Sequence, residues 1–475
     1  MKPKKIRFKP SLWSIEGGYR ELLVTALPLI MSTSSWTIQQ IVDRIFLTWH
    51  SPVAIAASMP AGVLNFCLMT FFLGTAGFVN TFVAQYHGAK LECRIGPILW
   101  QGIYVSLAGG ALIMLTVPFA GAIFGALGHA PDVRKAEIIY YQIMCLGVLP
   151  PLISNVLSCF WSGRGETWPL FWANIAGTAV NVVLDYILIF GKFGFPEMGI
   201  EGAAIATVIA GFVTMMYYVV SLASKKYVKR YDIFGSIRIQ PKLFGRLWKY
   251  GAPSGVQFFL DVMGWSVAIL IIGRLGTDNL AASNIAFNIN TVAFMPMIGF
   301  GIAVSILVGQ YLGRNKPKVA ERAVWLCFGL TFAYMGFVAI LYFFFPYVFL
   351  SPFAHGSSAK ETAAILATTA VLLKFIAVYS LFDTMNIVFL SALKGAGDTM
   401  YIMIMFGVAA VVLLIVPIYV MVVVFHMNLF AAWWIITIYI ASLGLLFLAR
   451  FLGGKWKSMR VIEPNLLPPG TCLPT

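Results

Sequence analysis

Residues 279–312 read NLAASNIAFNINTVAFMPMIGFGIAVSILVGQYL and contain no charged side chain. A helix needs about 20 predominantly apolar residues to cross a bilayer, and this stretch is longer. Similar stretches recur along the chain, which has 475 residues, 60% of them hydrophobic and 11% charged. Soluble globular proteins carry roughly 25% charged residues. The sequence therefore predicts an all-α membrane protein with many spans, and excludes a soluble enzyme and a disordered chain.

Charge clusters and Gly or Pro breaks divide the apolar sequence into twelve expected spans. Helices are favoured because the bilayer core holds no water, so backbone N–H and C=O groups must form hydrogen bonds with one another. The second and eighth segments are long enough to tilt or bend. The expected spans are 22–46, 52–82, 96–122, 137–161, 168–190, 201–223, 247–273, 279–312, 320–346, 364–392, 400–424 and 428–450.

The loops carry the positive charge unequally, and this asymmetry predicts the orientation. With twelve spans both termini lie on one side, which then holds 25 Lys and Arg against six on the other. Cytoplasmic loops are the ones enriched in Lys and Arg. We therefore expect both termini and the central linker in the cytoplasm, in a cell (inner) membrane. The net charge of +15 is thus explained by topology and not by nucleic-acid binding.

The two halves of the chain repeat each other. A shift of 225 residues aligns Val83-x-Gln85-Tyr86-x-Gly88 with Val308-x-Gln310-Tyr311-x-Gly313. A shift of 232 aligns Gly165-Glu166-Thr167 with Gly397-Asp398-Thr399. Each half has six spans, so both copies enter the membrane in the same sense, and in parallel repeats the substrate site lies between them. A transporter is therefore the leading class.

This repeat also predicts the domain organisation. Two six-helix bundles are expected, joined and flanked by basic segments. The expected parts are a cytoplasmic basic arm (1–19), an N-terminal bundle (20–224), a cytoplasmic basic linker (225–246), a C-terminal bundle (247–451) and a cytoplasmic tail (452–475).

Four of the 18 acidic residues fall within apolar runs: Asp43, Asp185, Asp261 and Asp383. A charge at the centre of a bilayer costs at least ~2.5–3.5 kcal/mol, so such residues are functional candidates by default. The alternative is a structural carboxylate that ties helices together through hydrogen bonds. Lys374 is also in an apolar run, and we interpret it as structural.

Polar neighbours lie one helical turn from three of these acids: Asn181 from Asp185, Gln257 from Asp261, and Tyr379 from Asp383. Carboxylate, amide and hydroxyl oxygens are ligands for small hard cations. Because burial favours the neutral form of a carboxyl group, the same residues suit a proton equally well. Na⁺ and H⁺ thus both remain open. Asn284 and Asn288 are candidates for lining a cavity, with interhelical hydrogen bonding as the alternative.

The sequence contains none of the common nucleotide-binding or hydrolase motifs considered. It has no GxxxxGK[ST] for ATP binding, and no GxSxG or HExxH for hydrolysis. We expect no enzyme activity, no cofactor, and no metal other than Na⁺ as a coupling ion.

Together with the duplication, an ordered series of motifs resembles the multidrug and toxic compound extrusion (MATE) family of secondary transporters. The likeness runs from about residue 20 to 450. The motifs are Pro28 with Val42-Asp43, Ala84-Gln85-x-x-Gly88-Ala89, Asn174 with Asn181-x-x-x-Asp185, Gly202-Ala203-Ala204-x-Ala206-Thr207, Gly251-x-Pro253, Met295-Pro296-x-x-Gly299, Gly309-Gln310-x-x-Gly313 and Leu393-Lys394-Gly395-x-Gly397-Asp398-Thr399.

The resemblance implies a V-shaped pair of six-helix bundles that alternates between outward and inward openings. It implies an N-lobe cation site at Asp43, Asn181, Asp185 and Thr207. A second-lobe site for cation or substrate would involve Tyr379, Asp383 and Asp261, with Gln257 beside them. Members with this second site usually have Glu where this chain has the shorter Asp261. Pro28 would be a bend that responds to Asp43, its alternative being an ordinary helix kink.

We therefore expect a monomeric antiporter that extrudes small organic, cationic and amphiphilic compounds in exchange for Na⁺ or H⁺. Charge decides against the main alternative, a flippase for a lipid-linked saccharide or other amphiphile. Such a protein needs cationic groups to meet phosphates, whereas the membrane-depth groups here are four acids and Lys374. A sensor or scaffold has no need for duplicated halves.

Overall fold

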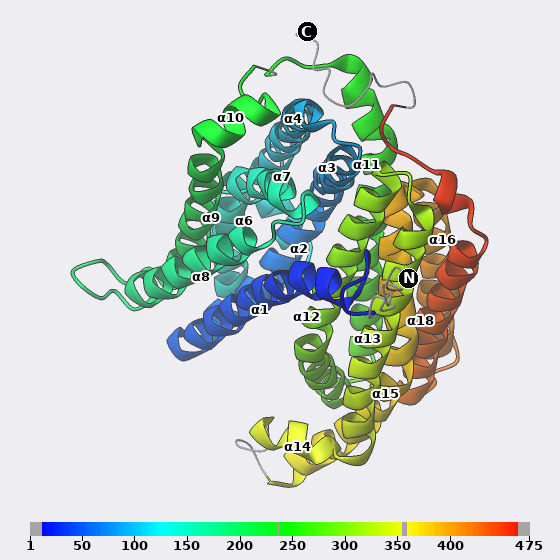
Figure 1. Cartoon of the computed structure of the whole chain (residues 1–475). Helices are drawn as coiled ribbons and strands as arrows, with labels where there is room; N and C mark the ends of the chain where they lie inside the picture. The colour runs from blue at the N-terminus through cyan, green and yellow to red at the C-terminus, as the bar shows by residue number, and fades with distance from the viewer. Residues whose placement is uncertain (1–11, 236, 354–358, 464–475) are drawn as a thin grey trace, which may run out of the picture.

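The structure is a computed structural model that describes residues 12–235, 237–353 and 359–463. Residues 1–11 of the predicted arm and 464–475 of the predicted tail lie outside the described residues. All regular secondary structure in the described part is helical, which confirms the predicted fold class (Figure 1).

Eleven helical segments of the described chain are long and apolar enough to cross a membrane, or twelve if a bent pair counts as one. The first six are α1 (Tyr19–His50), α2 with α3 (Pro52–Gly77, Val79–Gly88), α4 with α5 (Ile95–Met114, Ala120–Gly125), α6 with α7 (Pro131–Leu146, Leu149–Gly163), α8 (Trp168–Ile189) and α9 (Ile200–Leu222). The short α10 (Lys225–Tyr231) follows, and then α11 (Pro241–Gly273), α12 (Thr277–Gly313), α13 (Pro317–Phe344), α14 (Pro346–Leu350), α15 (Ala359–Ala396), α16 with α17 (Thr399–Ala409, Val416–Tyr419) and α18 (Leu429–Leu452).

The fourth span is the bent pair. It covers the span expected at 137–161 and is bent by 42° between α6 and α7. Pro150 and Pro151 have no backbone N–H to continue the α6 hydrogen bonds. At the break, a Cβ on Gly147 would lie 2.1 Å from the Val208 side chain of α9, so only glycine allows that approach.

The helices form two lobes (Figure 1). We call α1 to α9 the N-lobe and α11 to α18 the C-lobe. The two most extensive contacts between the lobes are made by α1 against α12 and by α2 against α11. The sequence repeat relates α1 to α11 and α2 to α12, so it exchanges these two pairs. This exchange is what a two-fold axis between parallel repeats produces.

Close contacts between the lobes gather at one end, where α3 and α12 finish and α11 starts. There a Cβ on Gly88 would lie 2.1 Å from the carbonyl oxygen of Gln310, and a Cβ on Gly313 would lie 2.2 Å from that of Gln85. The repeat relates these two contacts. We call this region the closed end, and its contact surface the seam.

Two hydrogen bonds cross the seam and obey the same symmetry. Gln85 Nε2 donates to the carbonyl oxygen of Gly395 at 3.1 Å, and Gln310 Nε2 donates to that of Gly163 at 2.9 Å. Thr33 of α1 also contacts α12: its hydroxyl lies 3.3 Å from the Met295 carbonyl oxygen. At the opposite end of the molecule, which we call the open end, α1 and the α14 end of the C-lobe point away from each other (Figure 1).

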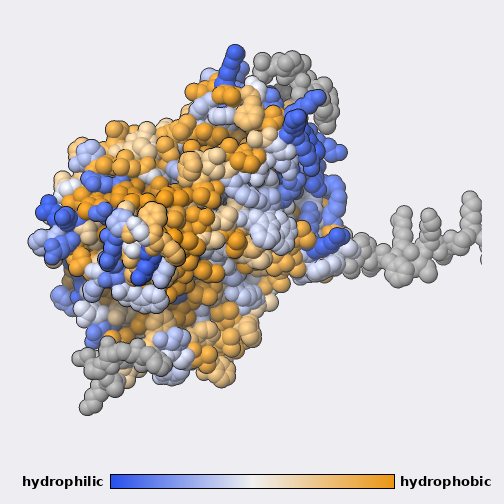
Figure 2. Space-filling model, turned by 90° about the vertical axis from the view of Figure 1, so that its left-hand side faces the viewer, coloured by the Kyte–Doolittle hydropathy of each residue, from blue (hydrophilic) through white to orange (hydrophobic). Residues whose placement is uncertain are grey.

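The face of the molecule seen in Figure 2 is apolar over a broad region, with many of its hydrophilic residues towards the edges. Large side chains such as Leu112, Val220, Leu270 and Phe337 are more than half exposed. Soluble proteins rarely expose so much apolar surface to water, whereas apolar side chains are favourable in contact with lipid tails. The chain is therefore a multi-pass membrane protein.

Arg164 fixes the linker helix α10 to the N-lobe. Its guanidinium lies 4.4 Å from the ring centre of Phe160 and 4.7 Å from that of Tyr231, and its side chain is 3% exposed. We expect Arg164→Gln to lower the free energy of unfolding by about 1–2 kcal/mol, since desolvated cation–π contacts are worth that much. Lys226→Gln, at an exposed ammonium 5.6 Å from the Tyr227 ring centre, should change it little. Thermal unfolding of both variants in detergent, compared with the parent, checks this difference.

Candidate functional site

The N-lobe acids come from two neighbouring helices. Asp43 lies on α1, ten residues past Thr33 and thus towards the open end, and Asp185 lies on α8. The helices pack side by side, and the two carboxyl groups interact electrostatically. Asp185 is fully buried. Two negative charges that interact in a buried site repel each other, so the pair suits a shared proton or a bound cation.

Asn181 and Thr207 complete this cluster. Asn181 is one turn before Asp185, is fully buried, and its Nδ2 lies 3.4 Å from the Thr207 hydroxyl on α9. That hydroxyl donates to the Ala203 carbonyl oxygen at 3.0 Å. Asp43 Oδ1, Asn181 Oδ1 and both Asp185 carboxyl oxygens are buried without a hydrogen-bond partner. Buried oxygens left without donors suit a small cation or a proton.

Tyr140 on α6 adds a neighbour that sequence reasoning missed. Its side chain is buried, and Asp43 and Asp185 both act on its hydroxyl electrostatically. No spacing relates Tyr140 to either acid, because it lies on a third helix. The sequence alone could not place Tyr140 beside these acids, because that position depends on the packing of α6 against α2 and α9.

The second-lobe residues also lie near one another. Asp383 and Asp261 interact electrostatically from α15 and α11, and Tyr379 lies one turn from Asp383. Asp383 Oδ1 accepts from Asn386 at 3.2 Å, and Gln257 Oε1 is buried without a partner. Lys394, which the charge pattern assigned to a loop, lies within α15 and interacts electrostatically with Asp261. The second group is therefore of mixed charge.

The remaining candidates take different positions. Asn284 and Asn288 are exposed and one turn apart on α12, while Asn290 Nδ2 lies 3.5 Å from the Tyr379 hydroxyl. Pro28 is buried inside α1, which continues as one helix through it. Lys374 is exposed, with its ammonium 5.5 Å from the ring centre of Phe343.

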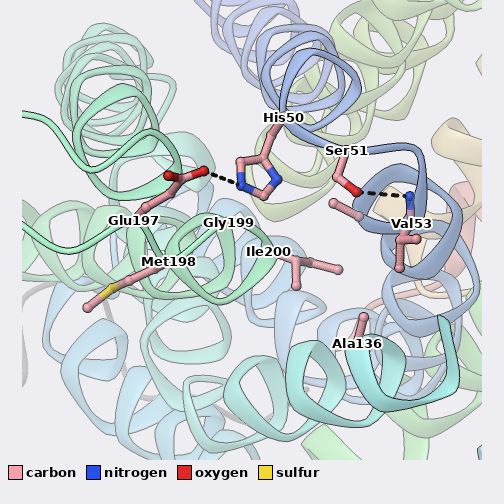
Figure 3. A pocket seen from close by; sticks show the side chains of 9 residues that line it. His50, Ser51, Val53, Ala136, Glu197, Met198, Gly199 and Ile200 are labelled. Atoms are coloured by element: carbon pink, nitrogen blue, oxygen red, sulfur yellow. Dashed lines mark hydrogen bonds and ion pairs between the residues drawn. The ribbon is translucent and has the colours of Figure 1, made fainter. Parts of the chain in front are cut away.

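A cavity of about 360 Å³ lies at the open end of the N-lobe, apart from these clusters (Figure 3). In it His50, the last residue of α1, meets Glu197 of the α8–α9 loop, with Nε2 and Oε1 3.1 Å apart. Gly199 forms part of the wall, where a Cβ would lie 2.6 Å from the His50 ring. The contact ties the end of α1 to the loop that follows α8.

Comparison with known proteins gives a family match over both lobes. The MatE family model matches residues 28–187 and 253–420. A probable multidrug resistance protein NorM of Bradyrhizobium diazoefficiens is 30% identical over 384 residues, which are 80% of this chain and 81% of that protein. A multidrug resistance protein NorM of Burkholderia vietnamiensis is 27% identical over 375 residues, 79% of this chain and 80% of the relative.

Solved structures share the fold at low identity. A MOP superfamily transporter from Pyrococcus furiosus, described as having a binding pocket of reversed polarity, gives a TM-score of 0.84 at 18% identity, covering 94% of this chain and 98% of that one. A multidrug resistance MATE family transporter in an outward-facing conformation gives 0.83 at 18% identity, with the same coverage. Both matches extend over the two lobes.

Proposed function

Because this chain belongs to the MATE family of multidrug efflux transporters, we propose that it exports organic, cationic, amphiphilic compounds in exchange for Na⁺ or H⁺. The observation that carries the proposal is the cluster of Asp43, Asp185 and Asn181, with its unpartnered buried oxygens. The chain is a transporter and not an enzyme. The NorM relatives, named as multidrug resistance proteins, support a drug-like substrate.

In this mechanism the coupling ion enters from the open end and binds at the Asp43–Asp185 pair. Binding neutralises charge that is costly at this depth. Since Asp43 lies on α1 and Asp185 on α8, the ion changes how the two helices attract each other. α1 also packs on α12 of the C-lobe, so its adjustment, with Pro28 as the bend, reaches the seam. Coupling requires only that the ion and the substrate prefer different states.

The excess of acidic over basic side chains in the two groups supports a cationic substrate over the phosphate of a flippase substrate. Asp261 and Asp383 place two carboxyl groups in the C-lobe. Lys394 interacts with Asp261, and Lys374 lies over Phe343 on an exposed face of α15. Across the two groups, four carboxyl groups (Asp43, Asp185, Asp261 and Asp383) outnumber the two lysines, which favours a cationic substrate.

The orientation follows from the same proposal. With the charge-rich side in the cytoplasm, the closed end is cytoplasmic and the lobes open outwards. A gradient of a coupling ion then drives export, to which a membrane potential adds ~2.3 kcal/mol per charge per 100 mV.

Transport in proteoliposomes tests the proposal. A fluorescent organic cation is loaded, and either a Na⁺ gradient or a pH gradient is imposed. We expect one gradient to accelerate efflux over a matched vesicle without a gradient, and an anionic dye to show no such acceleration. Equal efflux with and without both gradients would contradict antiport.

A further inference from the structure

The segment that follows α18 lies across the closed end. We call residues 455–463 the tail strap. It is anchored to its own lobe: Trp456 is fully buried, stacks on Phe451 with ring centres 4.9 Å apart, and donates from Nε1 to the Phe451 carbonyl oxygen at 2.9 Å. Arg246 Nε donates to the Val461 carbonyl oxygen at 3.0 Å. Lys457 also pairs with Glu321 of α13 at 2.8 Å.

The end of the strap binds the other lobe. The backbone N–H of Val461 donates to Gln85 Oε1 at 2.9 Å, and the Tyr86 hydroxyl donates to Glu463 Oε2 at 2.9 Å. Gln85 and Tyr86 belong to α3 of the N-lobe. Val461 and Tyr86 are both fully buried. The strap thus begins on the C-lobe and ends on the N-lobe.

Gln85 connects the strap to the seam. Its amide nitrogen donates across the seam to Gly395, while its amide oxygen accepts from the strap. One side chain is thereby fixed at both polar atoms by groups of the opposite lobe. Opening the closed end must separate α3 from α12 and from the strap together, because α3 packs against α12.

We propose that the tail strap is a latch that holds the seam closed, and that its release from Gln85 and Tyr86 accompanies each opening of the closed end. The strap stays on the C-lobe through Trp456, and only its N-lobe contacts break. It sets the balance between the two states of the transporter and limits how often the closed end opens. This inference rests on alternating access in the proposed function.

Hydrogen exchange of the intact protein in lipid nanodiscs, without substrate or gradient, tests the latch. Tyr86→Phe removes only the hydroxyl that binds Glu463. We expect exchange in peptides of α3 and of the 305–313 end of α12 to rise about tenfold, as for the loss of one hydrogen bond to a charged group. The matched control is Tyr342→Phe, another fully buried tyrosine, whose hydroxyl bonds to Ile289 within the C-lobe at 3.2 Å. It should leave seam exchange at the parent value.

Two further variants keep the test decisive if Tyr86→Phe does not fold. Glu463→Gln weakens the same bond from the strap, and a chain that ends after Ser458 removes the N-lobe contacts while retaining Trp456. Both should raise seam exchange. Parent-like exchange in all the folded variants would refute the latch. If the parent showed no gradient-driven transport while the variants showed faster seam exchange, the proposed antiport would be refuted and the latch supported. The two failures are therefore distinguishable.

Discussion

Asp185→Asn is expected to reduce ion-driven transport roughly 5–150-fold, the typical range of coupling between two ligands. Asparagine keeps the shape of the side chain and removes its charge. Asp185 lies fully buried beside Asp43, so the substitution leaves Asp43 as the one carboxyl group of the cluster. The difference in ion affinity between the two states is then largely lost. Efflux of a fluorescent cation from proteoliposomes under the driving gradient measures this reduction.

Further substitutions test whether the coupling site lies in the N-lobe or in the C-lobe. Asp43→Asn should reproduce the loss, since the two carboxyl groups act together. Asp383→Asn changes an acid that already accepts a hydrogen bond from Asn386 in the C-lobe, and gradient-driven efflux should persist. Parent-like transport by Asp185→Asn together with loss in Asp383→Asn would place the coupling site in the C-lobe instead.

Gly88→Ala is expected to prevent normal closure of the seam. Its Cβ would lie 2.1 Å from the carbonyl oxygen of Gln310, and backbone, unlike the tip of a side chain, cannot move aside cheaply. Overpacking of this kind costs about 1–3 kcal/mol, which reduces the closed population roughly 5–150-fold. Hydrogen exchange at the seam should therefore increase, and export should fall because the outward-open state is depleted.

The repeat supplies a second variant and a control. Gly313→Ala places its Cβ 2.2 Å from the Gln85 carbonyl oxygen and should have the same effect. Gly336→Ala, in α13, meets nothing within 4 Å and should leave both exchange and export unchanged. If Gly88→Ala behaved like Gly336→Ala, the seam would not be the closing surface.

Much of the fold followed from the sequence because lipid imposes simple rules. Continuous apolar runs such as 279–312 predicted the helices, and the match of Gln85 and Gln310 predicted the duplication. The bend between α6 and α7 was not predicted, because hydropathy carries no information on the angle that Pro150 and Pro151 introduce. The charge pattern assigned Lys394 to a loop, because a charge near the end of an apolar run looks the same whether it faces water or points towards Asp261.

The candidate site was predictable where polar spacing follows one helix. Asn181 and Asp185 share a face of α8, so their proximity needed no fold. The meeting of Asp43 with Asp185 and of Asn181 with Thr207 depends on the packing of α1, α8 and α9, and it was suggested only by resemblance to a family. Tyr140 and the strap contacts of Gln85 had no such guide, because they join helices remote in sequence.

The reciprocal bonds of Gln85 and Gln310 have the form of an isologous interface, in which a residue of each copy meets the same surface of the other. An ancestral six-helix chain would have closed its homodimer with one glutamine used twice, so that any single mutation altered both contacts at once. In the duplicated chain the two contacts are made by separate residues and can change independently. Gln85 now also holds the backbone of Val461, so the two copies of one ancestral contact have acquired separate duties.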